Sequence, residues 1–256
     1  SLGHAGFMCI GAYSAAIVVR SMSNLLGFAL GVGIGIVIST IAALIVSIPT
    51  LRLRGDYLAI ATLGFSEIIR IIVLNLKITN GAAGLSGIAK LTTWPLLFVL
   101  MVASIVIVTN FSRSRQGRAC ISIREDEIAS EAMGINTTRY KTTAFVIGAA
   151  LASVAGALYA CNFYVIKPDL FTFNKSIDIL VMVVFGGMGS MTGSVIAAAF
   201  IGVLNMLLQN FSSIRMVIYG VVLVAIMIFR PGGLLGTKEF TFSALLHRKR
   251  KEKGRK

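Results

Sequence analysis

The stretch "LLGFALGVGIGIVISTIAALIVSI", residues 25–48, decides the class of fold, because it contains no charged side chain. A helix that crosses the hydrocarbon core of a bilayer needs about 20 consecutive apolar residues, and this stretch supplies them. The whole chain agrees with it: of 256 residues, 56% are hydrophobic and 13% are charged. Soluble globular domains carry roughly 25% charged residues, so the composition excludes a water-soluble domain.

Further apolar stretches lie on both sides of this one. Tyr57–Asn75 contains a charged pair, and 5–19 is short for a bilayer span. The remaining apolar stretches are 94–108, 142–165, 177–185, 195–208 and 216–229. The pattern predicts an all-α, polytopic transmembrane helical bundle with about eight spanning or half-spanning segments.

The net charge of +14 could indicate nucleic acid, but its distribution indicates a membrane. When the basic end of the chain is assigned to the cytoplasm and the segments alternate sides, most Lys and Arg residues fall in the inside loops. We therefore expect a multi-pass protein in contact with the lipid bilayer, with a cytoplasmic C-terminus and no nucleic-acid partner. The sequence predicts one transmembrane domain over 1–240, followed by a basic cytoplasmic tail over 241–256.

Residues that carry chemistry are sparse in this sequence. The three cysteines are scattered, and His4 and His247 lie at opposite ends, so no metal-ligand or catalytic spacing occurs. No Gly-Lys-Ser/Thr triplet of a nucleotide-binding loop is present. We expect a chain that is not an enzyme and binds no cofactor or metal itself.

Small residues recur four apart in three segments, which predicts seams where helices approach closely. The three rows are Gly27, Gly31 and Gly35; Gly148, Ala152, Gly156 and Ala160; and Ser194, Ala198 and Gly202.

Two other features could border a translocation path. Glu67 and Arg70 share one face of a predicted membrane helix, where they either line a path or brace two helices. An intramembrane enzyme or ion-coupled carrier built on this pair is an alternative. The stretch "FGGMGSMTGS" (185–194) is either a glycine break beside a path or a tight surface turn. The path candidates are Gly64, Glu67, Gly186, Gly187 and Gly189.

A charged island, "REDEIASEAMGI" (124–135), interrupts the apolar sequence. Ser122 and Glu125 fit a capping box, and Gly134 fits a helix stop, so one helix of about 11 residues and about 16 Å is predicted over 122–134. Ile128, Ala129, Ala132 and Met133 give it a small apolar patch suited to a groove in another protein. The alternative, a helix lying on the membrane, is disfavoured because anionic lipid would repel its acids.

The stretch from "GRACISIREDEIASEAMGI" to "VAGALYA" (117–160) resembles the cytoplasmic coupling loop and following helix of ATP-binding-cassette (ABC) importer permeases. Within these it resembles the M-type branched-chain amino acid permease. Other matching stretches, in the same order, are "SLGHAGFMCIGAYSAA" (1–16), "LRLRGDYLAIATLGFSEIIRI" (51–71), "NGAAGLSGI" (80–88), "LVMVVFGGMGSMTGSVIAAA" (180–199) and "FRPGGLLG" (229–236).

This resemblance implies a permease domain over 1–240 with a coupling loop at 111–141, in a bacterial plasma (inner) membrane. It implies four partners: a homologous H-type permease subunit, two cytoplasmic ABC ATPases that use ATP and Mg, and an extracytoplasmic amino-acid-binding protein. The implied cargo is leucine, isoleucine or valine; urea, short amides or a sugar are alternatives on the same scaffold. It assigns ATPase coupling to Glu125, Ile128, Ala129, Glu131, Ala132 and Gly134. Such permeases carry one or two segments before residues 1–16, so we expect this sequence to be part of a longer chain.

Overall fold

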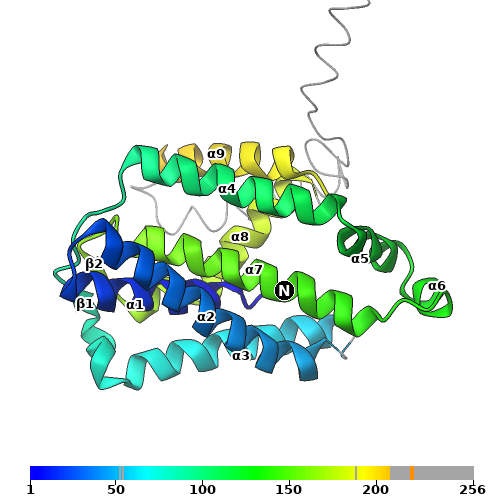
Figure 1. The fold of residues 1–256 in the computed structure, drawn as a ribbon, viewed down its shortest axis with the longest axis horizontal. Helices are drawn as coiled ribbons and strands as arrows, with labels where there is room; N and C mark the ends of the chain where they lie inside the picture. The colour runs from blue at the N-terminus through cyan, green and yellow to red at the C-terminus, as the bar shows by residue number, and fades with distance from the viewer. Residues whose placement is uncertain (52, 54, 188, 208–219, 222–256) are drawn as a thin grey trace, which may run out of the picture. The chain divides into compact units, whose positions relative to one another are not determined.

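The computed structural model describes residues 1–51, 53, 55–187, 189–207 and 220–221 (Figure 1). Within them the regular secondary structure is helical apart from two strands of two residues each, which confirms the all-α class. In the part of the chain that the structure describes, four helices are long and apolar enough to cross a membrane. They are α2 (Leu25–Thr50), α3 (Asp56–Asn75), α4 (Trp94–Arg113) and α7 (Thr137–Ala160). The predicted segment 216–229 and tail 241–256 lie outside the described residues, except for 220 and 221.

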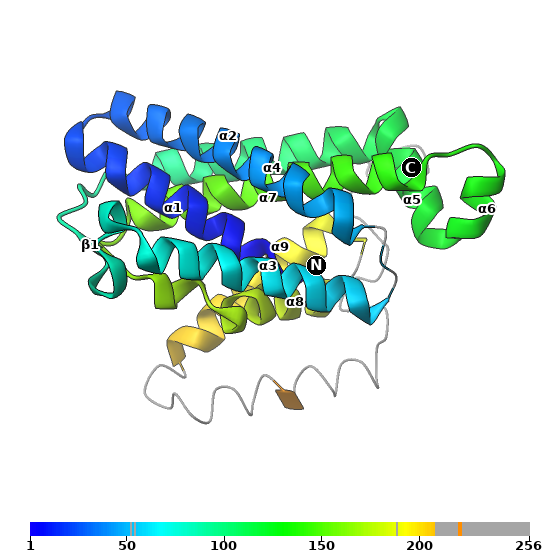
Figure 2. The same ribbon diagram turned by 90° about the horizontal axis from the view of Figure 1, so that it is seen from below.

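The chain divides into two compact units, Ser1–Ile177 and Asp178–Lys256. In the first unit, α1 (His4–Ser21) packs against both α2 and α7, and these three helices form the core (Figures 1 and 2). Phe7, Cys9 and Ala12 of α1 are almost fully buried there. The central position of α1 explains why a segment of only 18 residues is so apolar.

Small residues bring these helices into contact, as the first two predicted rows require. A side chain at Gly31 would meet the backbone of Ala15, and one at Gly156 would meet the carbonyl of Met8. The Ser39 hydroxyl donates to the Ala149 carbonyl across the α2–α7 contact at 3.0 Å. Since the hydrophobic effect does not drive helices together in lipid, close backbone packing and such hydrogen bonds hold the core.

Short irregular elements close one end of the first unit. They are η1 (Lys77–Thr79), η2 (Gly81–Ala83), β1 (Leu85–Ser86), β2 (Val165–Ile166) and η3 (Pro168–Phe171). The antiparallel pairing of β1 with β2 ties the loop after α3 to the loop after α7. At the opposite end lie α5 (Arg115–Glu125) and α6 (Glu127–Ala132), between α4 and α7 (Figures 1 and 2).

The remaining described helices are α8 (Phe173–Gly186), which contains the boundary between the units, and α9 (Met191–Leu207). Backbone contact between Gly186 and Gly193 leaves no room for a side chain at either position. The third predicted small-residue row is wrong within the described residues. On α9 the buried positions are Gly193, Ala197 and Ile201, one residue earlier than the predicted row, while Ala198 and Gly202 are exposed. One residue turns a helix by about 100°, so a four-residue spacing alone does not fix which face packs.

Candidate functional site

The charged island folds as two helices joined by a break, not as the single helix predicted over 122–134. The backbone of Asp126 is extended, with φ −153° and ψ 113°, so α5 ends at Glu125 and α6 starts at Glu127. The Asp126 carboxylate accepts a hydrogen bond from the Ala129 amide at 2.9 Å and caps α6. Ser122 lies inside α5, so its predicted capping role is wrong, and Glu125 closes α5 rather than opening the coupling helix.

The C-terminal end of α6 matches the prediction. Gly134 has φ +83°, the left-handed conformation that glycine adopts without penalty. Its amide donates to the Glu131 carbonyl at 2.9 Å, and the Ile135 amide donates to the Ser130 carbonyl at 3.0 Å. These two bonds form a Schellman motif, which satisfies carbonyls that the helix end would leave unpaired.

Polar side chains fasten this six-residue helix to its neighbours. A helix so short is not stable by itself, so these contacts fix its position. The three contacts are Ser122 Oγ to Ser130 Oγ at 2.8 Å, Lys141 Nζ to Glu127 Oε1 at 2.7 Å, and Thr137 Oγ1 to Glu131 Oε1 at 2.7 Å. The first joins α6 to α5, and the other two join it to α7. We call them the α6 clamp.

The face of α6 away from the clamp is open to solvent. Ile128 is 71% exposed and Met133 is 83% exposed, although both side chains are large and apolar. Ala129 and Ala132 are exposed as well, whereas Ser130 is buried. The structure therefore brings the predicted apolar patch together on one short, rigidly held element. Its role in coupling stays a prediction.

The Glu67–Arg70 pair forms as predicted, with Arg70 Nε 2.7 Å from Glu67 Oε2. Arg70 also reaches Asp169 of η3, with Nη1 3.3 Å from Oδ1. It therefore joins α3 to the loop after α7, which is a bracing geometry. Gly64 of α3 has open space at its Cα, since a side chain there would meet nothing within 4 Å.

The glycine break lies between α8 and α9. Gly187 and Gly189 have φ of +111° and +113°, values that other residues rarely adopt. Ser190 follows, and its hydroxyl accepts from the Gly193 amide at 3.1 Å to cap α9. Gly64 and Glu67 belong to the first unit, and Gly186, Gly187 and Gly189 lie in the second, so a shared path through all five stays a prediction.

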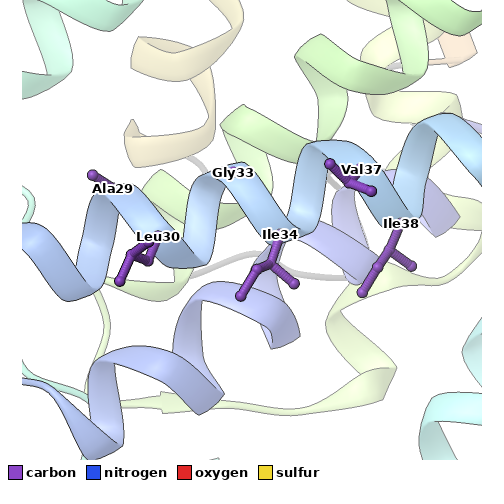
Figure 3. Close-up of a pocket in the computed structure, with 6 residues that line it drawn as sticks. All are labelled: Ala29, Leu30, Gly33, Ile34, Val37 and Ile38. Atoms are coloured by element: carbon purple, nitrogen blue, oxygen red, sulfur yellow. The ribbon is translucent and has the colours of Figure 1, made fainter.

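A surface pocket of about 360 Å³ runs along α2 (Figure 3). Its lining residues are Ala29, Leu30, Gly33, Ile34, Val37 and Ile38. None of them has a polar side chain, so the pocket suits an acyl chain or another helix. A zwitterionic ligand would leave its charges without partners there, at a large desolvation cost. Among the described residues, no group of three or more His, Cys, Asp or Glu side chains could hold a metal ion.

Sequence reasoning missed the α6 clamp, the Asp126 cap and the partner of Arg70. The aspartate offered a signal, because Asp is a preferred N-cap residue. The clamp and the Arg70–Asp169 pair had none, since Arg70 and Asp169 are 99 positions apart in the sequence.

Residues 1–229 match the family described as the branched-chain amino acid transport system permease component. The chain belongs to this permease family. Membership in this family and the apolar helices together show that the protein is a multi-pass membrane protein.

Relatives of this permease include two proteins named high-affinity branched-chain amino acid transport system permease protein LivM. The one from Salmonella typhimurium is 38% identical over 269 residues, and the one from Escherichia coli K12 is 37% identical over 269 residues. Each alignment covers 91% of this chain and 63% of the relative, so the chain spans under two thirds of those proteins. The permease protein LivH of Salmonella typhimurium is 34% identical over 148 residues, covering 57% of this chain and 47% of LivH. No solved structure matches.

Proposed function

We propose that this chain belongs to the membrane-spanning part of an ABC importer that moves leucine, isoleucine and valine across a bacterial plasma membrane. In this proposal the chain does no chemistry; it forms one wall of a path and moves when separate ATPases bind and hydrolyse ATP with Mg. The observation that carries the proposal is α6: a short helix, fixed by the α6 clamp, that presents Ile128 and Met133 to solvent at one end of the membrane unit.

The exposed patch is suited to a groove on a cytoplasmic ATPase. Full burial of one large apolar side chain stabilises a complex by about 1.5–3 kcal/mol. Ile128 and Met133 are 71% and 83% exposed, so most of this contribution is still available for binding. The two side chains together account for roughly 2–5 kcal/mol, which is enough to direct docking to this point.

Movement of the ATPase would then reach the core through two connections. Glu127 and Glu131 of α6 hold Lys141 and Thr137, which lie in the first turns of α7. Because α7 packs against α1 and α2, a displacement of α6 is transmitted to the core of the unit. Through Ser122 and α5, the same displacement reaches the end of α4.

The proposal requires further chains. LivM and LivH are names of two related permease proteins, and we propose that an H-type subunit completes the path beside this one. Two ATPases would bind at the α6 end, on the cytoplasmic side with the C-terminus. An extracytoplasmic amino-acid-binding protein would deliver cargo at the other end, where η1, η2, η3 and the β1–β2 pair lie.

Reconstitution of the permease with these partners in liposomes tests the proposal. ATP-dependent uptake of labelled leucine, isoleucine or valine is expected. Uptake of urea, a short amide or a sugar in their place would refute the proposed cargo but support the importer function. Uptake without the ATPases would refute the importer function.

The Ala132→Asp variant tests the docking role of α6, because Ala132 is exposed and its loss does not disturb the core. A charge there should abolish uptake while the protein still inserts into the membrane. Ala132→Ser is the matched control, because it changes the same exposed position without adding a charge, and it should retain uptake. Normal uptake by Ala132→Asp would show that α6 is not the dock.

A further inference from the structure

Three arginines gather where α4 meets α5, at a bend that we call the elbow (residues 111–118). Arg113 ends α4, Arg115 begins α5, and Arg118 follows one turn later; all three are exposed. No carboxylate pairs with any of them among the ion pairs of the described residues. Arg124 and Lys141 of the same loop, by contrast, pair with Glu125 and Glu127. The elbow therefore carries concentrated positive charge that no carboxylate of the described residues neutralises.

The dimensions of α4 place the elbow at the membrane surface. Its 20 residues extend about 30 Å, the thickness of the hydrocarbon core. Trp94 at its start is 85% exposed, and tryptophan favours the interface between hydrocarbon and water. No residue of α4 is buried, and Arg113 is its only charged residue. With Trp94 at one interface, Arg113 lies at the other.

Local contacts hold the elbow in one geometry. The Ser114 hydroxyl donates to the Phe111 carbonyl at 2.6 Å and accepts from the Gly117 amide at 3.1 Å. Gly117 packs against the backbone of Phe111 and Ser112, where no side chain would fit. Arg118 Nη1 donates to the Arg113 carbonyl at 2.8 Å, which holds this guanidinium at the end of α4.

We propose that the elbow binds the phosphate groups of anionic phospholipids in the leaflet on the α6 side of the membrane. A guanidinium has five N–H donors and recognises phosphate oxygens in a bidentate manner. The one recorded bond from the Arg118 guanidinium uses a single nitrogen, so donors remain for a ligand. Three neighbouring guanidinium groups at headgroup depth, of which that of Arg118 is fixed at the end of α4, match a phosphate better than a protein surface, because the ATPase dock proposed above lies further out on α6. The inference goes beyond the proposed function and does not depend on the cargo.

Binding of lipid by the full chain, purified with its partner subunits, tests the inference. Native mass spectrometry counts bound dioleoylphosphatidylglycerol, which is anionic, against dioleoylphosphatidylcholine, which has no net charge. Each basic residue near an anionic surface changes binding about fivefold, so Arg113→Gln/Arg115→Gln/Arg118→Gln should weaken phosphatidylglycerol binding about 100-fold. Arg113→Lys/Arg115→Lys/Arg118→Lys keeps the charge and should retain most of the binding.

Two further variants keep the test decisive. Arg115→Gln removes a side chain for which the structure records no hydrogen bond, so it should fold normally and bind about fivefold more weakly. Arg124→Gln is the matched control outside the elbow and should bind like the parent protein. Unchanged phosphatidylglycerol binding by the triple glutamine variant, or equal binding of phosphatidylcholine, would overturn the inference. So would a triple variant that keeps the lipid but loses the ATPases, since the elbow would then be a protein dock.

Discussion

Replacement of Ile128 by alanine separates docking from folding. Ile128 is 71% exposed on α6, so its side chain contributes little to the stability of the isolated permease. Scaled by that exposed share, the burial free energy of a large aliphatic side chain gives about 1–2 kcal/mol for contact with an ATPase. Ile128→Ala should therefore weaken ATPase binding about 5- to 30-fold and change the free energy of unfolding by less than about 0.5 kcal/mol.

Ile123 provides the matched comparison. It is the same residue type on the adjacent α5, but only 7% exposed. Truncation of a buried isoleucine costs about 2–5 kcal/mol, so Ile123→Ala should lower the thermal stability of the permease. Titration of a labelled ATPase against the permease in nanodiscs measures affinity, and thermal unfolding of both variants measures stability. An Ile128→Ala variant with parental ATPase affinity would refute the docking role of this side chain. A large loss of stability in the same variant would show that Ile128 is packed inside the permease and not exposed on α6.

Asp126→Ala removes the cap of α6 and should destabilise that helix by about 1 kcal/mol, seen as faster hydrogen exchange of its amides; parental exchange rates would contradict the capping role. Trp94 is the single tryptophan of the chain. Its fluorescence should be quenched more by lipids brominated near the headgroup than by lipids brominated near the end of the acyl chain. The reverse order would show that the start of α4 does not lie at the membrane interface. Burial raises the pKa of the Cys120 thiol, and because the thiolate is the reactive form, its alkylation in a Cys9→Ser/Cys161→Ser background should require a higher pH than alkylation of the denatured chain. Equal pH profiles for the native and denatured chains would show that Cys120 is not shielded.

Long apolar runs were readable from the sequence because the bilayer imposes length and hydrophobicity on each helix separately. Residues 25–48 predicted α2 almost to its ends, and the segment with the charged pair became α3. The predicted loop at 111–141 lies between α4 and α7, and both helices extend into it, to Arg113 and from Thr137. The end of α6 at Gly134 could also be predicted from the sequence, since it depends on the backbone conformation of one residue.

The choice between neighbouring N-cap residues was harder to predict from the sequence. Ser122 and Asp126 both fit an N-cap, and the sequence gives no reason to prefer one. In the folded protein, Ser122 instead contacts Ser130 on α6, and the α6 clamp places this short helix against α5 and α7. The choice of Asp126 thus goes together with tertiary contacts that a local pattern does not contain.

Sequence alone determined that this chain is a set of membrane helices with one short charged element between two of them, because hydrophobic length and capping chemistry act over a few neighbouring residues. Only the tertiary structure decided which faces meet: Gly193, Ala197 and Ile201 rather than the row one residue later, and Arg70 with Asp169 across 99 positions. Packing and pairing between distant segments depend on where whole helices lie, and no spacing along the chain records that.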